Sequence, residues 1–145
     1  MKAIKILSLI VFSLTLTFCN GQNQKEISKQ DKAISKIEVL DFHSTHRCMT
    51  CNAIEANTRY TLDTYFKNEM KTGKITFQTV NVNKKENEKL AEKFEAAGTS
   101  LYLNVVKNGK EKQINLTDFA FSKGNDKDTF SNELKSKIEN ELEQL

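Results

Sequence analysis

The chain has 145 residues, of which 38% are apolar and 28% charged, enough for one domain with its own core but not for two large ones. Its formal net charge is +3, from 22 Lys and Arg against 19 Asp and Glu, so electrostatics give no case for binding nucleic acid. Three cysteines are too few for a disulfide-dense scaffold, and the chain contains no proline.

The first residues have the pattern of an export signal. Two lysines precede an apolar run over residues 6–18, which is shorter than the roughly 20 residues that a membrane-spanning helix needs. We therefore predict a signal peptide at residues 1–19, a polar tether at 20–36 and a folded domain at 37–145. The expected location is outside the cytoplasm of a bacterium, either periplasmic or anchored to the membrane as a lipoprotein.

Cys19 leaves two ways of processing open. Residues 16–19 (Leu-Thr-Phe-Cys) resemble a bacterial lipobox, in which Cys19 is lipidated and becomes the new N-terminus, although Phe18 stands where a small residue is usual. The alternative is ordinary cleavage near residues 19–21 without use of this cysteine. The only membrane contact we expect is a lipid on Cys19, and export would place the other cysteines where disulfides persist.

The domain alternates strand and helix signals. Apolar residues repeat at steps of two in the strands and of three or four in the helices; the face expected to be buried on the first helix holds Ile54, Thr58, Leu62, Tyr65 and Phe66. In chain order the sequence predicts a strand at 37–42, a helix from Cys48 to about Met70 ended by Gly73, a strand at 75–82, a helix at 87–97 ended by Gly98, strands at 101–105 and 113–116, and a helix at 126–145.

A hairpin joins the last two predicted strands. Asn108-Gly109 is a strong signal for a type I′ turn, since both residues tolerate positive φ. Strands separated by helices are expected to pair in parallel through crossovers. The order β-α-β-α-β-β-α therefore predicts an α/β sandwich with a mixed four-stranded sheet. Phe119 and Phe121, before the last helix, are expected to join the core or to offer an apolar contact to a partner.

Two cysteines bracket two residues at the predicted start of the first helix. Their spacing brings the sulfurs within bonding reach, and the helix N-terminus favours a thiolate on Cys48. Arg47 is expected to act in the same direction. The thiolate attacks in disulfide exchange, so Cys48 is the predicted nucleophile and Cys51, one turn inside, the resolving thiol. The alternative is an inert structural disulfide, although a bridge across two residues constrains the chain little.

In this context the chain resembles the thioredoxin superfamily over about residues 37–145. Residues 39–42 (Val-Leu-Asp-Phe), followed closely by Cys48-x-x-Cys51, are similar to the first strand and redox motif of that family, and residues 80–83 to the end of its second strand. The resemblance implies a thioredoxin-like sandwich and a thiol–disulfide oxidoreductase. It also implies protein thiols or disulfides as partners and no cofactor.

A narrower resemblance rests on residues 42–43, 47–51 and 54–55. These are similar to exported bacterial proteins labelled ArsF-type nitrophenyl compound nitroreductase subunits. Nothing in the chain resembles a flavin or nitroaromatic site, so the motif supports thiol chemistry only.

The chain also departs from the family pattern. Ser100 stands where the family has a cis-proline, and Thr99 and Ser100 are expected against the disulfide. A non-proline cis bond costs about 2.5–4 kcal/mol, which favours a trans bond before Ser100. Asp41 falls near the position at which the family has a buried acid. In the family, that acid assists proton transfer to the resolving thiol. Thr79 replaces the usual Lys partner of that acid, and an unpaired buried carboxylate tends to take up a proton. The alternative for Asp41 is a solvated acid at the end of a strand.

Both histidines lie in the loop before the cysteines, which raises a rival function. His43, His46, Cys48 and Cys51 fall within nine residues, and their side chains are usual ligands of zinc and copper. A metal carrier using these four is one alternative, although structural zinc sites usually draw ligands from two separated elements. Without metal, His43 is expected at the strand end and His46 in the loop, where it tunes the thiol. The other alternative is a non-catalytic thioredoxin-like binding module.

Overall fold

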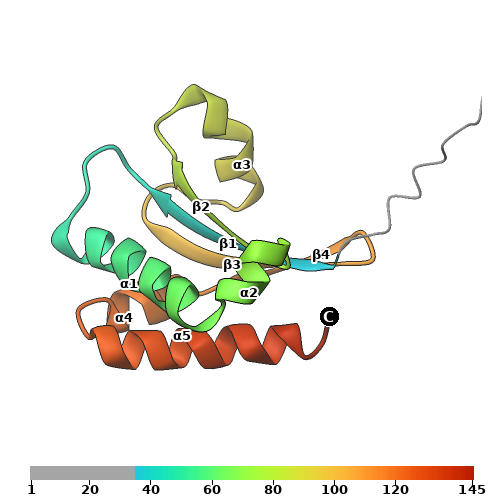
Figure 1. Cartoon of the computed structure of the whole chain (residues 1–145). Coiled ribbons are helices and arrows are strands. Elements are labelled where there is room, and N and C mark those ends of the chain that lie inside the picture. The colour runs from blue at the N-terminus through green and yellow to red at the C-terminus, as the bar shows by residue number, and fades with distance from the viewer. Residues whose placement is uncertain (1–34) are drawn as a thin grey trace, which may run out of the picture.

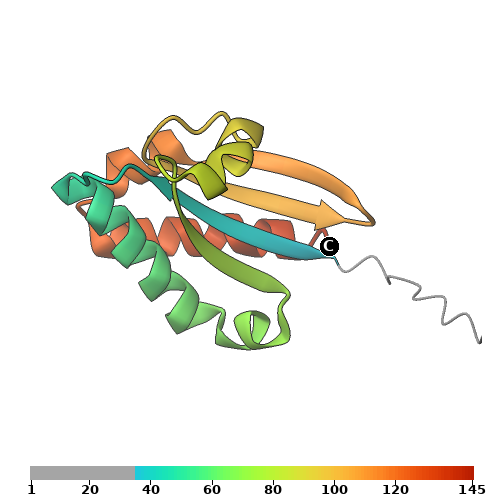
Figure 2. The same cartoon turned by 90° about the horizontal axis from the view of Figure 1, so that it is seen from above.

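A computed structural model describes residues 35–145, so the predicted signal peptide, Cys19 and all but the last two residues of the predicted tether lie outside the described residues. Four strands form one sheet in the order β2-β1-β3-β4 (Figure 2). The elements are β1 (Lys36–His43), α1 (Met49–Tyr65), α2 (Lys67–Thr72), β2 (Ile75–Asn81), a 3-10 turn η1 (Lys85–Asn87), α3 (Glu88–Lys93), β3 (Ser100–Lys107), β4 (Lys110–Asn115), α4 (Thr117–Lys123) and α5 (Lys127–Leu142).

The sheet is mixed, as the sequence predicted, but the expectation that strands separated by helices pair in parallel is wrong for β3. The segment that contains α3 begins and ends at the same edge of the sheet, where Ser100 pairs with Phe42, so β3 runs back against β1. β1 is parallel to β2, whereas β3 is antiparallel to both of its neighbours, β1 and β4. The turn between β3 and β4 has positive φ at Asn108 (52°) and Gly109 (76°), which confirms the predicted hairpin. The predicted order of strands and helices is also confirmed, with one helix added before the last.

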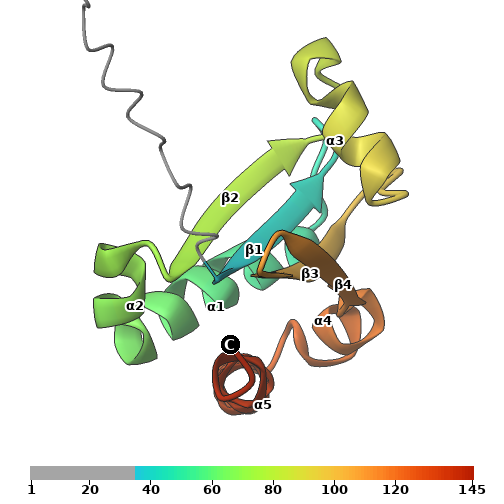
Figure 3. The ribbon, with the colours of Figure 1, turned by 90° about the vertical axis from the view of Figure 1, so that its right-hand side faces the viewer.

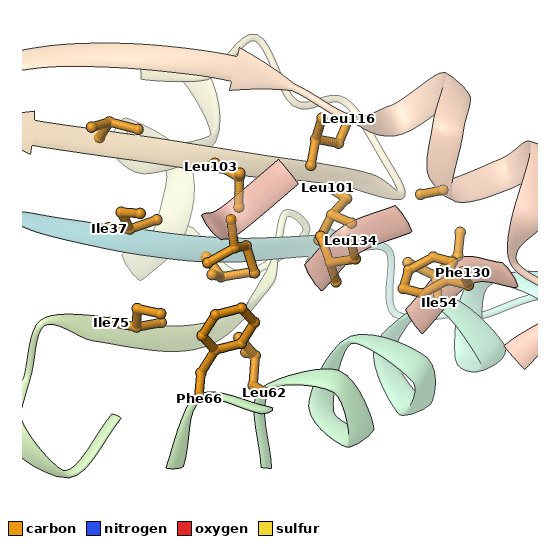
Figure 4. Packing of buried hydrophobic residues seen from close by; sticks show 14 residues of the cluster. Ile37, Ile54, Leu62, Phe66, Ile75, Leu101, Leu103, Leu116, Phe130 and Leu134 are labelled. Carbon is orange, nitrogen blue, oxygen red and sulfur yellow. The ribbon is translucent and has the colours of Figure 1, made fainter. Parts of the chain in front are cut away.

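Helices cover both faces of the sheet, and strand alternation supplies a core on each side (Figures 1 and 3). Ile37 and Val39 of β1 face α1, α4 and α5, where the larger core lies (Figure 4). Leu40 and Phe42 face α3 and contribute to a smaller aromatic core with Phe94. Among residues 35–145, no helix is long and apolar enough to cross a membrane.

The predicted helix from Cys48 to Met70 is wrong in its continuity. Phe66 leaves helical geometry (φ −125°, ψ 25°) and separates α1 from α2. Its side chain is buried, whereas Tyr65, expected in the core, is 41% exposed. The break turns the aromatic ring of Phe66 into the core, and burial of such a ring stabilises the fold by about 1.5–3 kcal/mol. Gly73, at φ 74°, ends α2 as predicted.

The predicted ends of two further elements are wrong. α3 stops at Lys93 instead of continuing toward Gly98, because Glu95 takes the left-handed position (φ 51°) and the Ala96 amide donates to the Ala91 carbonyl. β4 begins at Lys110 instead of residue 113, and its charged edge lacks the apolar alternation that marks a strand. Lys36, placed in the tether, is the first residue of β1.

Sequence periodicity missed α4 altogether. This helix has seven residues, too few for a repeated apolar pattern, and follows β4 after one residue. Phe119 packs on the core, with its ring centroid 5.0 Å from that of Phe130, while Phe121 is 43% exposed. The two phenylalanines therefore differ: one belongs to the core and the other lies on the surface.

Candidate active site

The two cysteines of the motif form a disulfide at the start of α1. Cys48 is the N-cap residue, in extended geometry (φ −75°, ψ 166°), and its sulfur accepts a hydrogen bond from the Cys51 amide at 3.0 Å. Cys48 is exposed, whereas Cys51 is only 7% exposed. The pair therefore consists of an outer and an inner cysteine, as the sequence predicted. It lies at the edge of the sheet where the chain passes from β1 to α1.

The surroundings of the Cys48 sulfur favour a negative charge after reduction. The sulfur lies at the positive end of a 17-residue helix, next to an amide that points at it. The first turn of α1 contains no acidic residue to oppose this field. A thiolate on Cys48 is therefore stabilised by α1 itself.

Arg47 faces a different partner from the one that the sequence suggested. Its side chain is 18% exposed and turns inward, under the helix. One guanidinium nitrogen, Nη1, donates to Glu55, while the other, Nη2, donates to Asp41 Oδ2 and to the Cys51 carbonyl, both at 3.3 Å. The hydrogen bonds of the guanidinium thus lead to the inner cysteine and not to Cys48.

Asp41 is a buried acid, not the solvated acid of the alternative prediction. It has no exposed surface, and burial raises its pKa to about 7, although the Arg47 guanidinium opposes this shift. The expectation that it lacks a partner is wrong, because Arg47 replaces the missing Lys. Thr79, opposite Asp41 in β2, is exposed. Asp41 Oδ1 has no hydrogen-bond partner among the described residues.

The loop between β1 and α1 is attached to the turn after β2. The Thr45 amide donates to Asn83 Oδ1 at 2.8 Å, and the Val82 amide donates to the His43 carbonyl at 2.9 Å. Asn81 supports the turn by accepting from the Asn83 amide at 2.9 Å. These contacts, which the sequence did not predict, hold the residues that precede Cys48 in position.

The histidines do not join the cysteines in a cluster. His43 is partly buried, with Nδ1 at 2.9 Å from the Ser44 carbonyl, and His46 is exposed in the loop. Within residues 35–145, no three His, Cys, Asp or Glu side chains are grouped so that they could hold a metal ion. In the oxidised state described here both sulfurs are also committed to the disulfide.

Thr99 and Ser100 lie at the start of β3, next to the end of β1. Ser100 is opposite Phe42, and the peptide bond before it is trans, as the absence of proline favoured. The Ser100 hydroxyl donates to the Gly98 carbonyl at 3.3 Å, within its own loop. The hydrogen bonds of the described residues do not connect either side chain to the cysteines.

The connection from α4 to α5 lies against the first turns of α1. Thr50, between the cysteines, is 3.3 Å from the Asn125 amide nitrogen, and buried Asn57 donates to the Gly124 carbonyl at 2.9 Å. A Cβ on Gly124 would lie 3.0 Å from Thr50 Cγ2 and 2.8 Å from the Ala120 carbonyl oxygen, so this close approach needs glycine. Met49, on the open side of the motif, is 88% exposed.

No family model and no curated protein matches the chain. Solved structures similar to it include a malarial protein (21% identity, TM-score 0.39, covering 61% of this chain and 94% of the other). A thioredoxin from Fasciola hepatica gives the same identity and TM-score over 61% of this chain and 76% of its own. A thioredoxin from Thermus thermophilus is 19% identical (TM-score 0.37, covering 55% of this chain and 58% of its own).

The fold class follows from the topology itself. A β2-β1-β3-β4 sheet with only β3 reversed, helices on both faces and a Cys-x-x-Cys disulfide at the start of α1 define an α/β thioredoxin-like sandwich. The predicted fold class is thus confirmed.

Proposed function

We propose that this protein is a thiol–disulfide oxidoreductase that acts on protein thiols or disulfides. The observation that carries the proposal is the asymmetry of the pair: Cys48 is an exposed residue whose sulfur caps α1, while Cys51 is only 7% exposed. An attacking thiol must be reachable and ionised, whereas the resolving thiol needs only to reach its neighbour. The two cysteines satisfy these separate requirements.

In the reducing direction, the Cys48 thiolate attacks a substrate disulfide and releases one substrate thiolate, which takes up a proton. The Cys51 thiol then loses its proton and attacks Cys48 of the mixed disulfide. The Cys48–Cys51 disulfide forms and the second substrate thiolate leaves. Two electrons pass from the cysteine pair to the substrate, so no cofactor takes part in the exchange, and the reverse sequence oxidises a substrate dithiol.

Asp41 is proposed as the group that exchanges the proton of Cys51. Its carboxylate shares one guanidinium nitrogen of Arg47 with the Cys51 carbonyl, which places it on the buried side of the disulfide. A carboxyl whose pKa is raised by burial to about 7 is available in both protonation states near neutral pH. His46, in the exposed loop, and Thr99 and Ser100, beside β1, are proposed to border the surface that receives the substrate.

Exchange with glutathione tests the proposal in both directions. Reduced protein is mixed with oxidised glutathione and oxidised protein with reduced glutathione, and the redox state of the pair is read by mass after alkylation. Both mixtures are expected to reach the same ratio of dithiol to disulfide, and Cys48→Ser is expected to abolish the exchange. A disulfide that reduced glutathione leaves untouched would support the binding module instead.

The same samples separate thiol chemistry from metal transport. Reduced protein is dialysed against zinc and then against buffer, and bound metal is measured for the wild type, His43→Ala and His46→Ala. One zinc ion per chain that survives dialysis, and is lost from both histidine variants, would favour the carrier.

We also propose that the protein is exported from a bacterium, with a lipid on Cys19 as its membrane anchor. Support comes from the two lysines before residues 6–18 and from the similarity of residues 42–43, 47–51 and 54–55 to exported ArsF-type proteins. Mass spectrometry of the mature protein is expected to find a new N-terminus between Cys19 and about Gln24. If Cys19 leads, it should carry acyl chains. Recovery of the full-length chain from the cytoplasm would contradict export.

A further inference from the structure

Beneath the disulfide, one arginine is shared between two carboxylates. Arg47 bonds Glu55 through Nη1 and Asp41 through Nη2, the latter at 3.3 Å. Both acids are shielded, since Asp41 is fully buried and the Glu55 side chain is 23% exposed. One positive charge therefore serves two acids.

Glu55 is held in this position from both sides. Arg59, four residues further along α1, donates to its other carboxylate oxygen at 3.0 Å. Burial opposes ionisation of Glu55, but the hydrogen bonds from Arg47 and Arg59 outweigh it and lower its pKa. Glu55 thus remains an anion and draws the Arg47 guanidinium toward α1.

Asp41 receives only part of the charge of Arg47. Desolvation by burial raises its pKa, Arg47 lowers it, and the Glu55 anion raises it again. The backbone neighbours of Asp41 in the sheet, Thr79 in β2 and Leu101 in β3, carry no charge.

The remaining ionisable groups around Asp41 are few. Arg59 acts on it from α1 and lowers its pKa weakly. His43 follows two residues later on β1, and the Cys51 thiol, when reduced, lies on α1 above Arg47. An experiment on the pH dependence of Asp41 must therefore exclude a contribution from the His43 imidazole.

We infer that Glu55 is a positioning residue of the thiol site: it competes with Asp41 for the Arg47 guanidinium and so keeps Asp41 able to accept the proton of the Cys51 thiol. The role in catalysis rests on the function proposed above. During resolution, the proton of the Cys51 thiol passes to the Asp41 carboxylate while the sulfur electron pair forms the bond to Cys48 and the substrate thiolate leaves. A fully paired Asp41 would remain ionised and accept this proton poorly.

Opposite substitutions are expected to move Asp41 in opposite directions. Glu55→Gln removes the competing anion and is expected to lower the Asp41 titration midpoint by about one pH unit, the usual scale for a neighbouring charge. Arg47→Met removes the cation and is expected to raise the midpoint. Glu55→Asp retains the charge and should stay closer to the wild type. A structural defect alone would not produce shifts of opposite sign.

The titration is read in the oxidised protein, where it does not depend on exchange activity. Aspartate labelled with ¹³C at the carboxyl carbon is followed by NMR against pH, and the Asp41 signal is identified by its loss in Asp41→Asn. Glu133→Gln, which removes a carboxylate 3.9 Å from Lys123, is the matched control and should leave the midpoint unchanged. An Asp41 midpoint that is equal in the wild type and Glu55→Gln overturns the inference.

Exchange with oxidised glutathione then connects the titration to the reaction. The pH profile of the rate of disulfide formation is expected to shift to lower pH in Glu55→Gln and to higher pH in Arg47→Met, also in a His43→Asn background. A profile that does not follow the Asp41 midpoint overturns the positioning role. Absence of exchange in the wild type, with the NMR shifts as expected, would count against the proposed function and not against the competition for Arg47.

Discussion

Cys51→Ser is expected to accumulate as a mixed disulfide through Cys48, whereas Cys48→Ser should accumulate none. In the wild type, Cys51 attacks the mixed disulfide and releases the substrate, so its removal stops the reaction after the first step. Cys48 is an exposed residue at the N-terminus of α1, while Cys51 is 7% exposed and lies within the first turn. The remaining thiol of Cys48→Ser is therefore expected to react slowly.

The trapping is measured with insulin as the protein disulfide. Each reduced variant is incubated with insulin, quenched by alkylation and analysed by non-reducing electrophoresis and mass spectrometry. Near-stoichiometric adducts are expected for Cys51→Ser, and the double variant serves as the control. Equal trapping by the two single variants would refute the division into an attacking and a resolving thiol. The absence of trapping in both would direct attention to the exposed surface around Phe121 as a binding site.

Asp41→Asn is expected to stabilise the fold at high pH and to leave it nearly unchanged at low pH. The folded-state pKa of Asp41 is about 7, against an ordinary value of 3.8, so the folded protein binds more protons than the unfolded chain between these values. The contribution of Asp41 to the free energy of unfolding is thus full below pH 4 and is lost as the pH rises to about 7. A shift of this size corresponds to about 4 kcal/mol as an upper bound.

Urea unfolding of the oxidised protein at pH 4 and pH 8 measures this difference. The gain at pH 8 should not exceed this upper bound, and the ion pair with Arg47 is already included in the pKa of about 7. Asp63→Asn, on an exposed position of α1, should show no such pH dependence. Parallel stability profiles of the wild type and Asp41→Asn would contradict a raised pKa. In the reduced protein, the same variant is expected to slow resolution by Cys51.

Local patterns account for much of this fold. Asn108-Gly109 specifies a turn through its own backbone preferences, and the alternation at Ile37, Val39 and Asp41 places these residues on one face of β1. Likewise, the position of Cys48 at the start of α1 and its greater exposure than Cys51 could be predicted from the Cys-x-x-Cys spacing. These features depend on residues at most a few positions apart.

Other features depend on contacts between residues far apart in the sequence, which no local pattern predicts. The break at Phe66 depends on the core accepting its aromatic ring, and α4 is too short to show a period. The need for glycine at position 124 is partly of this kind, because Thr50 and Ile54 of α1 lie against it in addition to the Ala120 carbonyl of α4.

The cysteine pair, its helix and the order of strands and helices along the chain were therefore determined by the sequence on its own, through backbone preferences and periodic burial. The order of the strands across the sheet and the antiparallel direction of β3 were set by the tertiary structure. The partner of Asp41 was decided only by the tertiary structure. Arg47 is six residues after Asp41 and eight before Glu55, a spacing that no single helix or strand brings together. The contact arises because the loop after β1 turns back under α1 and brings Arg47 to the buried Asp41. Burial disfavours an unpaired carboxylate, and the cation that pairs with Asp41 is shared with Glu55.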